Sequence, residues 1–370
     1  MNAPVYRGLT WDHPRGCNAL AAAAAQASGL SLHWDKHPLE GFESHPIADL
    51  CARYDLVVLD HPHVGEAVAA DCLVPVESLF GAEEIAGWQA AVAGPSLASY
   101  RYAGQHWALP LDAATQVTAY RRATVESPPV AWDELPAFAA QHAVALSLAG
   151  PHAILSLQSV CGALGAERSG EAFIDRAVAR EGYALMLALT GDATVNAQAL
   201  NPIAMLGAIE RGDGIDLCPL IYGYVNYATL GVGFADAPCG PDGRIGSTLG
   251  GTGIGVSKRC EVTPALLDHL RWLMSQQVQR GFIPQHDGQP ALRAAWQDAA
   301  VNAATGNFFG ATLASVEQAL LRPRHDGAIA FQTHASARLR AALLEGAAAD
   351  PVLDDLETLY RNHHPAGAET

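Results

Sequence analysis

The sequence has few charged residues and an excess of acidic ones. Only 16% of its residues are charged, and 38 Asp and Glu against 22 Lys and Arg give a formal net charge of −16. This charge repels phosphate backbones, which excludes nucleic acid as a partner. No run approaches the roughly 18 consecutive apolar residues that a membrane-spanning helix needs, so we expect no membrane span.

Cysteine is scarce and shows no pairing motif. The seven cysteines are odd in number, widely spaced and without a C-x-x-C pair. This usage is typical of reduced thiols in a cytosolic protein and offers no zinc-finger or iron–sulfur spacing. We therefore expect neither a metal nor a cofactor. His13, His61, His63 and Asp60 have suitable ligand types for a metal but no diagnostic spacing.

Export and nucleophile motifs are also missing. Residues 19–25 are apolar, but Asp12 stands before them in place of a basic segment, and alanine runs favour a helix over a signal sequence. The chain as it stands is predicted to be cytoplasmic, and periplasmic or extracellular if it is a mature form. No G-x-S-x-G elbow or H-E-x-x-H helix is present, so nucleophilic catalysis has no support.

The remaining pattern alternates strands and helices over a chain long enough for two lobes. Residues 5–11, 30–34 and 54–60 read as strands and residues 17–27 and 47–53 as helices. The unbroken apolar run 56–59 suits a parallel strand covered on both faces, which predicts a doubly wound α/β sheet.

A crossing into a second lobe follows. We expect short strands at 99–102 and 106–109, a strand at 115–120, a strand at 143–148 and a glycine-rich return strand at 249–256, whereas residues 322–327 read as a surface turn. The predicted lobes are discontinuous: residues 1–112 plus 250–300, and residues 113–249 plus 301–370.

Four segments resemble, in order, the family-1 extracellular solute-binding proteins, the sugar and polyol receptors of bacterial ABC importers. They are YDLVVLD from residue 54, YAGQHWALP from 102, GGTGIGVSK from 250, and GQP from 288 with Arg293 and Trp296. The resemblance implies a periplasmic-binding-protein-like fold: two doubly wound lobes with a ligand cleft at the hinge. It also implies a small-molecule ligand and, for an exported form, an ABC permease as partner.

Ionisable side chains follow the first and third predicted strands. Because ligands bind beyond the carboxyl ends of parallel strands, these side chains should share one cleft wall. Arg15 could grip an anion, and His13 or His61 could transfer protons. As alternatives, Asp12 caps a helix and His63 starts one. The candidate ligand-binding residues of this wall are Trp11, Asp12, His13, Arg15, Asp60, His61 and His63.

The second wall is expected where the chain crosses between lobes and in the opposite lobe. Aromatic rings there could stack on a sugar face, and glycines permit close backbone approach. Trp107 could equally be a core residue of the hinge. The candidates are Trp107, Asp112, Thr115, Gln116, Tyr222, Tyr224, Asn226, Gly251 and Thr252.

Two functions remain open on sequence grounds. The first is a solute-binding protein that closes its lobes over a small polar solute: a sugar, a polyol or a small carboxylate. The second is a cytoplasmic enzyme on the same scaffold, a lyase, hydratase or isomerase. His13, His61 and Asp60 would then perform acid–base chemistry.

Overall fold

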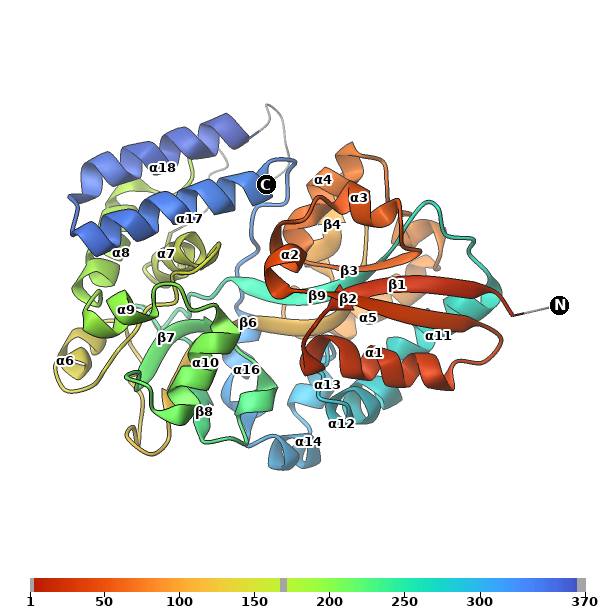
Figure 1. Cartoon of the computed structure of the whole chain (residues 1–370), viewed down its shortest axis with the longest axis horizontal. Coiled ribbons are helices and arrows are strands. Elements are labelled where there is room, and N and C mark those ends of the chain that lie inside the picture. The colour runs from red at the N-terminus through yellow and green to blue at the C-terminus, as the bar shows by residue number, and fades with distance from the viewer. Residues whose placement is uncertain (1–2, 167–171, 365–370) are drawn as a thin grey trace.

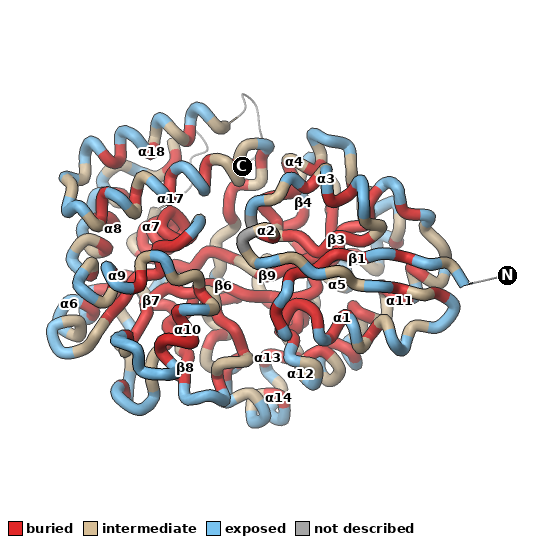
Figure 2. Tube along the Cα trace, viewed as in Figure 1, coloured by how far each residue is buried: buried red, intermediate tan, exposed pale blue. Residues whose placement is uncertain are grey.

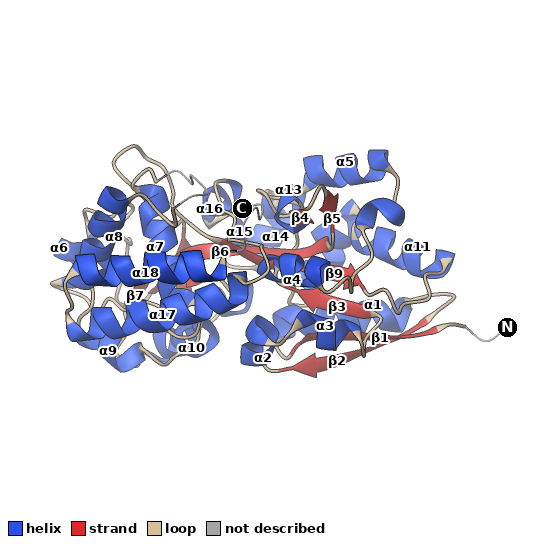
Figure 3. Ribbon diagram, turned by 90° about the horizontal axis from the view of Figure 1, so that it is seen from above, coloured by secondary structure: helices blue, strands red, loops and turns tan. Residues whose placement is uncertain are grey.

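The computed structural model describes residues 3–166 and 172–364. Two lobes lie side by side, joined by long strands that run from one to the other (Figures 1 and 3). Buried residues concentrate on the strands and on the inner faces of the helices in both lobes (Figure 2). Among the described residues, no helix combines the length and the apolar character needed to cross a membrane.

The first lobe contains the parallel strands that the apolar runs predict. Strand β1 pairs in parallel with β2 and β3, and β3 pairs antiparallel with β9 (Leu249–Val256). All four residues of β3 are buried, as expected of a strand covered on both faces. The strands are β1 (Val5–Trp11), β2 (Ser31–His37) and β3 (Leu56–Leu59), with a small hairpin of β4 (Arg101–Tyr102) and β5 (Gln105–His106).

Helices cover this sheet and enclose two apolar cores, one around Leu56 and Leu270 and one around Val57 and Val64. Helix α1 begins where Pro14 supplies a first-turn residue that needs no amide donor. The helices are α1 (Pro14–Gln26), α2 (Leu39–Ser44), α3 (Ile47–Cys51), α4 (Val64–Ala69), α5 (Ala82–Ala91), α11 (Pro264–Leu273), α12 (Ile283–Gln285) and α13 (Arg293–Trp296).

Two long antiparallel strands connect the lobes. Strand β6 (Leu109–Arg121) is a single 13-residue strand, longer than the predicted strand at 115–120, and its partner is β9 (Leu249–Val256). In the second lobe β6 pairs antiparallel with β7 (Leu217–Tyr222) and β8 (Val232–Ala235). The strand predicted at 143–148 is wrong: these residues form only an isolated bridge between Val144 and Leu217.

The second lobe has its own cores, one around Leu157 and Phe331 and one around Ile221 and Phe308. Its helices are α6 (Leu135–Ala139), α7 (His152–Ala163), α8 (Arg176–Ala188), α9 (Asp192–Ala197), α10 (Pro202–Arg211), α14 (Ala299–Ala304), α15 (Phe308–Ala311), α16 (Leu313–Glu317), α17 (Ala328–Glu345) and α18 (Ala349–His363). The predicted lobe boundaries stay a proposal, and they include residues 1–2, 167–171 and 365–370, which lie outside the described residues.

Candidate ligand-binding site

A narrow cavity of about 50 Å³ lies between the lobes. The first lobe contributes the ends of β1 and β3 and the start of α1, and the second contributes the starts of α7 and α10 and the end of β7. Its lining residues are Trp11, Arg15, Leu39, Phe42, Asp60, Ala114, Pro151, His152, Leu155, Pro202, Tyr222, Tyr224, Gly250, Gly251, Thr252 and Arg322.

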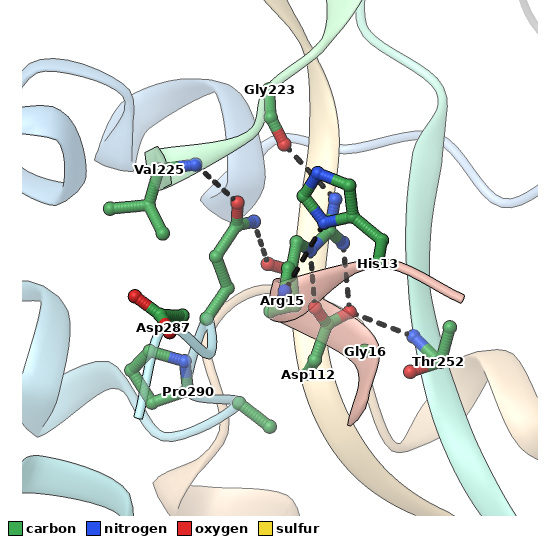
Figure 4. A network of polar contacts seen from close by, with 12 residues as sticks. His13, Arg15, Gly16, Asp112, Gly223, Val225, Thr252, Asp287 and Pro290 are labelled. Atoms are coloured by element: carbon green, nitrogen blue, oxygen red, sulfur yellow. Dashed lines mark hydrogen bonds and ion pairs between the residues drawn. The ribbon is translucent and has the colours of Figure 1, made fainter. Parts of the chain in front are cut away.

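Arg15 lines this cavity and bonds both Asp112 on β6 and the backbone of Gly223, which follows β7 (Figure 4). Its Nε and Nη2 atoms donate to both carboxylate oxygens of Asp112 at 2.6 and 3.0 Å, and Nη1 donates to the carbonyl of Gly223 at 3.1 Å. The guanidinium carbon lies 4.6 Å from the ring centroid of Tyr224. Burial raises the pKa of the Asp112 carboxyl, and the charge of Arg15 opposes that rise. All three guanidinium nitrogens of Arg15 are thus hydrogen-bonded within the protein in this conformation.

Arg322 and Asp60, which also line the cavity, form a second, largely buried ion pair. Nη2 of Arg322 donates to Oδ2 of Asp60 at 3.0 Å, and the backbone amide of Arg322 donates to Nε2 of His61 at 3.2 Å. Arg322 is only 4% exposed, so the prediction of a solvated surface turn at this position is wrong. The segment turns inward because His61 and Asp60 together bind its backbone and its guanidinium group.

The charges of these two pairs balance. Arg15 and Asp112 cancel, as do Arg322 and Asp60. His152 also lines the cavity, and burial, followed by the nearby charge of Arg322, lowers its pKa to about 3, so it is neutral at physiological pH. A cavity whose described charged groups sum to zero favours a neutral ligand, because an ion would lose its hydration without a counter-charge.

Two polar atoms of the cavity wall are left for a ligand. The Nε1 atom of Trp11 and the Oγ1 atom of Thr252 are buried, and neither has a hydrogen-bond partner among the described residues. An unmet buried polar group is costly and rare in folded proteins. Both residues line the cavity, so a hydroxyl-bearing ligand that reached these two atoms would satisfy them.

The structure brings part of the predicted site together. Seven predicted residues line the cavity: Trp11, Arg15, Asp60, Tyr222, Tyr224, Gly251 and Thr252. Asp112 lies behind them through its ion pair with Arg15.

His13 and His61 each accept a hydrogen bond from a backbone amide and do not line the cavity. Nδ1 of His13 accepts the amide of Arg15 at 3.2 Å and so caps α1, and its ring stands edge-on to Tyr224 at 4.8 Å. Burial, followed by the charge of Arg15, lowers the pKa of His13 to about 4. His61 is fully buried and accepts the amide of Arg322.

The other predicted residues lie away from the cavity. Asp12 is exposed and pairs with Lys36, and His63 is buried 3.5 Å from Glu66. Trp107 is a core residue of the first lobe whose Nε1 donates to the carbonyl of Tyr102 at 2.9 Å.

Thr115, Gln116 and Asn226 also serve other contacts. Oε1 of Gln116 accepts Oγ1 of Thr248 at 2.9 Å, and Thr115 bonds Ser247 in the same buried network. Asn226 donates to the carbonyl of Asp287 at 3.2 Å.

Sequence reasoning missed several lining residues. Most of them lie at helix starts or in short helices. There a proline beside a capping position predicts a helix but does not show which side chains will face the cavity. The missed residues are Leu39, Phe42, Pro151, His152, Leu155, Pro202 and Arg322. No group of three or more His, Cys, Asp or Glu residues within 3–166 and 172–364 is arranged to hold a metal ion.

Comparison with known proteins gives a clear match in structure only. No family model and no curated sequence matches the chain. The maltose-bound MalE3 of T. maritima superposes with a TM-score of 0.79 at 17% identity, covering 97% of this chain and 100% of that one. An ABC transporter solute-binding protein from Agrobacterium radiobacter K84 in complex with ribitol gives 0.76 at 17%, covering 96% and 98%.

The cyclic α-maltosyl-1,6-maltose binding protein of Arthrobacter globiformis gives a TM-score of 0.77 at 17% identity, with coverage of 98% and 99%. The match over nearly the full length of each chain shows the fold. The predicted two-lobed, periplasmic-binding-protein-like α/β architecture is therefore confirmed.

Proposed function

We propose that this chain is a solute-binding protein that closes its two lobes over a small neutral sugar or polyol. The observation that carries the proposal is the charge-balanced cavity between the lobes, with aromatic walls and unmet polar atoms. The solved structures that share its fold include a maltose-bound protein and a ribitol complex, which supports the same ligand class.

The chemistry of the wall fits a polyhydroxy compound. The side chains of Trp11, Tyr222 and Tyr224 give the wall aromatic surface, and the Asp60–Arg322 pair offers both acceptors and donors to hydroxyls. Of the predicted ligands, a small carboxylate fits least well, because each guanidinium group already faces a carboxylate.

Acid–base catalysis is not proposed. His13 caps the start of α1, and His61 accepts the backbone amide of Arg322. In each ring one nitrogen is therefore already hydrogen-bonded within the fold. If the chain is exported, we propose an ABC permease as its partner and a periplasmic or extracellular location.

A thermal-shift screen tests the proposal. The purified chain is mixed with pentitols, hexoses, disaccharides, small carboxylates and betaines, and every stabilising compound is recovered and weighed by mass spectrometry. A ligand at 100 times its Kd stabilises the folded state by about 2.7 kcal/mol, which shifts the melting temperature measurably.

We expect a neutral sugar or polyol to stabilise the chain and to be recovered unchanged. Stabilisation by carboxylates or betaines alone, or recovery of a dehydrated or isomerised product, would contradict the proposal.

A further inference from the structure

The fold of the first lobe brings Cys51 and Cys72 together. Cys51 is the last residue of α3, and Cys72 follows α4. The two helices lie side by side (Figures 1 and 3), and the backbone amide of Ile47 in α3 donates to Oε1 of Glu66 in α4 at 3.0 Å. Both cysteines pack in the same apolar core of this lobe.

Backbone hydrogen bonds hold Cys72 in its position. Its amide donates to the carbonyl of Ala67 at 3.1 Å, and its carbonyl accepts the amide of Lys258 at 3.0 Å. The next residue, Leu73, forms an isolated bridge with Ser257. The folded chain itself therefore places Cys72 against the end of α3.

The two thiols differ in reactivity. A hydrogen bond from the thiol of Cys51 to Sγ of Cys72 raises the pKa of Cys51, as burial also does, and lowers the pKa of Cys72. Cys51 is only 3% exposed, whereas Cys72 is partly buried. The thiolate is the nucleophile in thiol–disulfide exchange. Cys72 is therefore the thiol that can attack a dissolved disulfide, with Cys51 next to it and shielded from solvent.

Other buried cysteines lack this chemistry. Burial is the main cause that raises the pKa values of Cys161, Cys218 and Cys260 to about 12 each. Thiols with such pKa values stay protonated and unreactive near neutral pH. Oxidation of the folded chain should therefore be selective for the pair in the first lobe.

We propose that Cys51 and Cys72 form a redox-active dithiol that a low-molecular-weight disulfide, such as oxidised glutathione, converts to an intramolecular disulfide. The thiolate of Cys72 attacks one glutathione sulfur, forms a mixed disulfide and releases the first glutathione thiolate. Cys51 then loses its proton and attacks Sγ of Cys72, which breaks the mixed disulfide and releases the second thiolate. The two protons lost by the cysteines protonate the two glutathione thiolates, so two thiols are oxidised as one disulfide is reduced.

The bond closes a loop that carries part of the ligand cavity. Residues 51–72 contain β3, α4 and Asp60, which pairs with Arg322. A disulfide stabilises a fold mainly by restricting the unfolded chain within the closed loop. The oxidised form is therefore the more stable one and the one expected in an oxidising compartment, whereas a reducing cytosol keeps the two thiols.

Peptide mapping of the full chain tests the proposal. The reduced protein is incubated with oxidised glutathione, alkylated during denaturation and digested with trypsin without a reductant. Trypsin places the two cysteines in separate peptides, residues 37–53 and 54–101, neither of which contains another cysteine. We expect these peptides to be recovered joined by a disulfide as the main product. Recovery of both thiols unmodified, glutathione left on Cys72, or a bond to another cysteine would overturn the proposal.

Two serine variants separate the roles of the thiols, and a third is the control. Cys51→Ser removes the second nucleophile, so glutathione should remain on Cys72 as a stable mixed disulfide. Cys72→Ser should leave the buried Cys51 unmodified. Cys239→Ser removes another partly buried cysteine and should form the bond as the parent chain does. Glutathione on Cys51 in Cys72→Ser would overturn the assignment of Cys72 as the attacking thiol.

Thermal unfolding tests whether the folded positions of the two cysteines suit the bond. The cross-linked parent chain should melt at least about 4 °C above the reduced chain, because the closed loop restricts the unfolded state. The same treatment should leave the melting temperature of Cys72→Ser unchanged. An equal or lower melting temperature of the cross-linked parent chain would show that the bond strains the first lobe, and it would overturn the proposal that the fold is built to accept it.

Discussion

Thr252 is a buried residue whose side chain and backbone serve different partners. Its amide donates to Oδ1 of Asp112 at 3.0 Å, which holds β9 against the Arg15 ion pair. Its hydroxyl is buried and has no hydrogen-bond partner among the described residues, and the residue lines the cavity. The backbone therefore serves the fold, whereas the hydroxyl is bonded to no described residue.

Replacing Thr252 with valine separates these two roles. Valine keeps the shape and the strand preference but removes the hydroxyl. We expect the free energy of unfolding of the ligand-free chain to stay the same or to rise by up to about 1–3 kcal/mol, because an unmet buried hydroxyl is removed and no protein hydrogen bond is lost. Affinity for the ligand should fall about tenfold, which corresponds to about 1.4 kcal/mol.

Denaturant unfolding and calorimetric titration of the two proteins measure both effects. Thr118→Val is a suitable control, because that hydroxyl donates to the carbonyl of Pro219 at 3.3 Å and does not line the cavity. The ligand role of Thr252 is contradicted if Thr252→Val binds as tightly as the parent chain.

His13 makes stability depend on pH. Its folded-state pKa of about 4 lies below the ordinary histidine value of 6.5, so the folded chain takes up fewer protons than the unfolded chain between these values. Stability contributed by neutral His13 is thus complete above pH 6.5 and falls as the pH drops, by about 1.4 kcal/mol per unit, until it is lost below pH 4.

His13→Asn tests this dependence. Asparagine is a good N-cap but does not titrate in this range, so the variant should match the parent chain near pH 7.5 and become the more stable of the two near pH 4.5. Urea unfolding across this range gives the comparison, and parallel pH profiles would show that His13 is not the titrating group.

The position of polar and aromatic residues at the ends of predicted strands was enough to predict part of the cavity lining. Trp11, Arg15 and Asp60 follow strands whose carboxyl ends meet, and that topological rule was enough to place them at the cavity. The inward turn of Arg322 could not be predicted, because its partners Asp60 and His61 are more than 250 residues away in sequence.

At the scale of elements, the glycines of β9 let the crossing strands lie close. Gly251 has φ +85°, and a Cβ there would lie 2.5 Å from the carbonyl oxygen of Asp112. Gly250 faces the ring of Tyr222, where a Cβ would lie 2.6 Å away. Side chains at these positions would displace cavity-forming groups.

We expect Gly251→Ala to destabilise the fold by roughly 1–3 kcal/mol because alanine is strained at this positive φ. The clash of its Cβ with the backbone of Asp112 should add to this cost. Gly87→Ala is the matched control, since the exposed Gly87 lies within α5 with nothing within 4 Å of a new Cβ and should gain up to about 1 kcal/mol of helix propensity. Thermal unfolding of both variants checks the contrast. Equal melting temperatures would mean that β9 tolerates a side chain at Gly251.

Local periodicity predicted the elements of the first lobe better than those of the second. Strands β1 and β3 are flanked by clear turns, so the pattern found them. Strand β6 was predicted only in part, because Pro110 and Asp112 interrupt its apolar run near a register shift against β9. The segment 143–148 is apolar because it is buried beside β7, and burial alone does not make a strand.

At the scale of the whole molecule, the lobes touch across the cleft. Arg15 bonds the carbonyl of Gly223, and Arg322 pairs with Asp60. Strands β6 and β9 and the segment before α17 are the connections about which closure would occur (Figures 1 and 3). A ligand that binds only between closed lobes would shift the population toward this conformation.

The central claim is that one neutral sugar or polyol binds in this charge-balanced cleft. The most direct test is calorimetric titration of the full chain with the best ligand of the screen, in two buffers of different ionisation enthalpy. The account predicts one ligand per chain and the same binding enthalpy in both buffers, because no proton is exchanged. Binding of only charged compounds, or a buffer-dependent enthalpy that reports proton uptake or release, would contradict it.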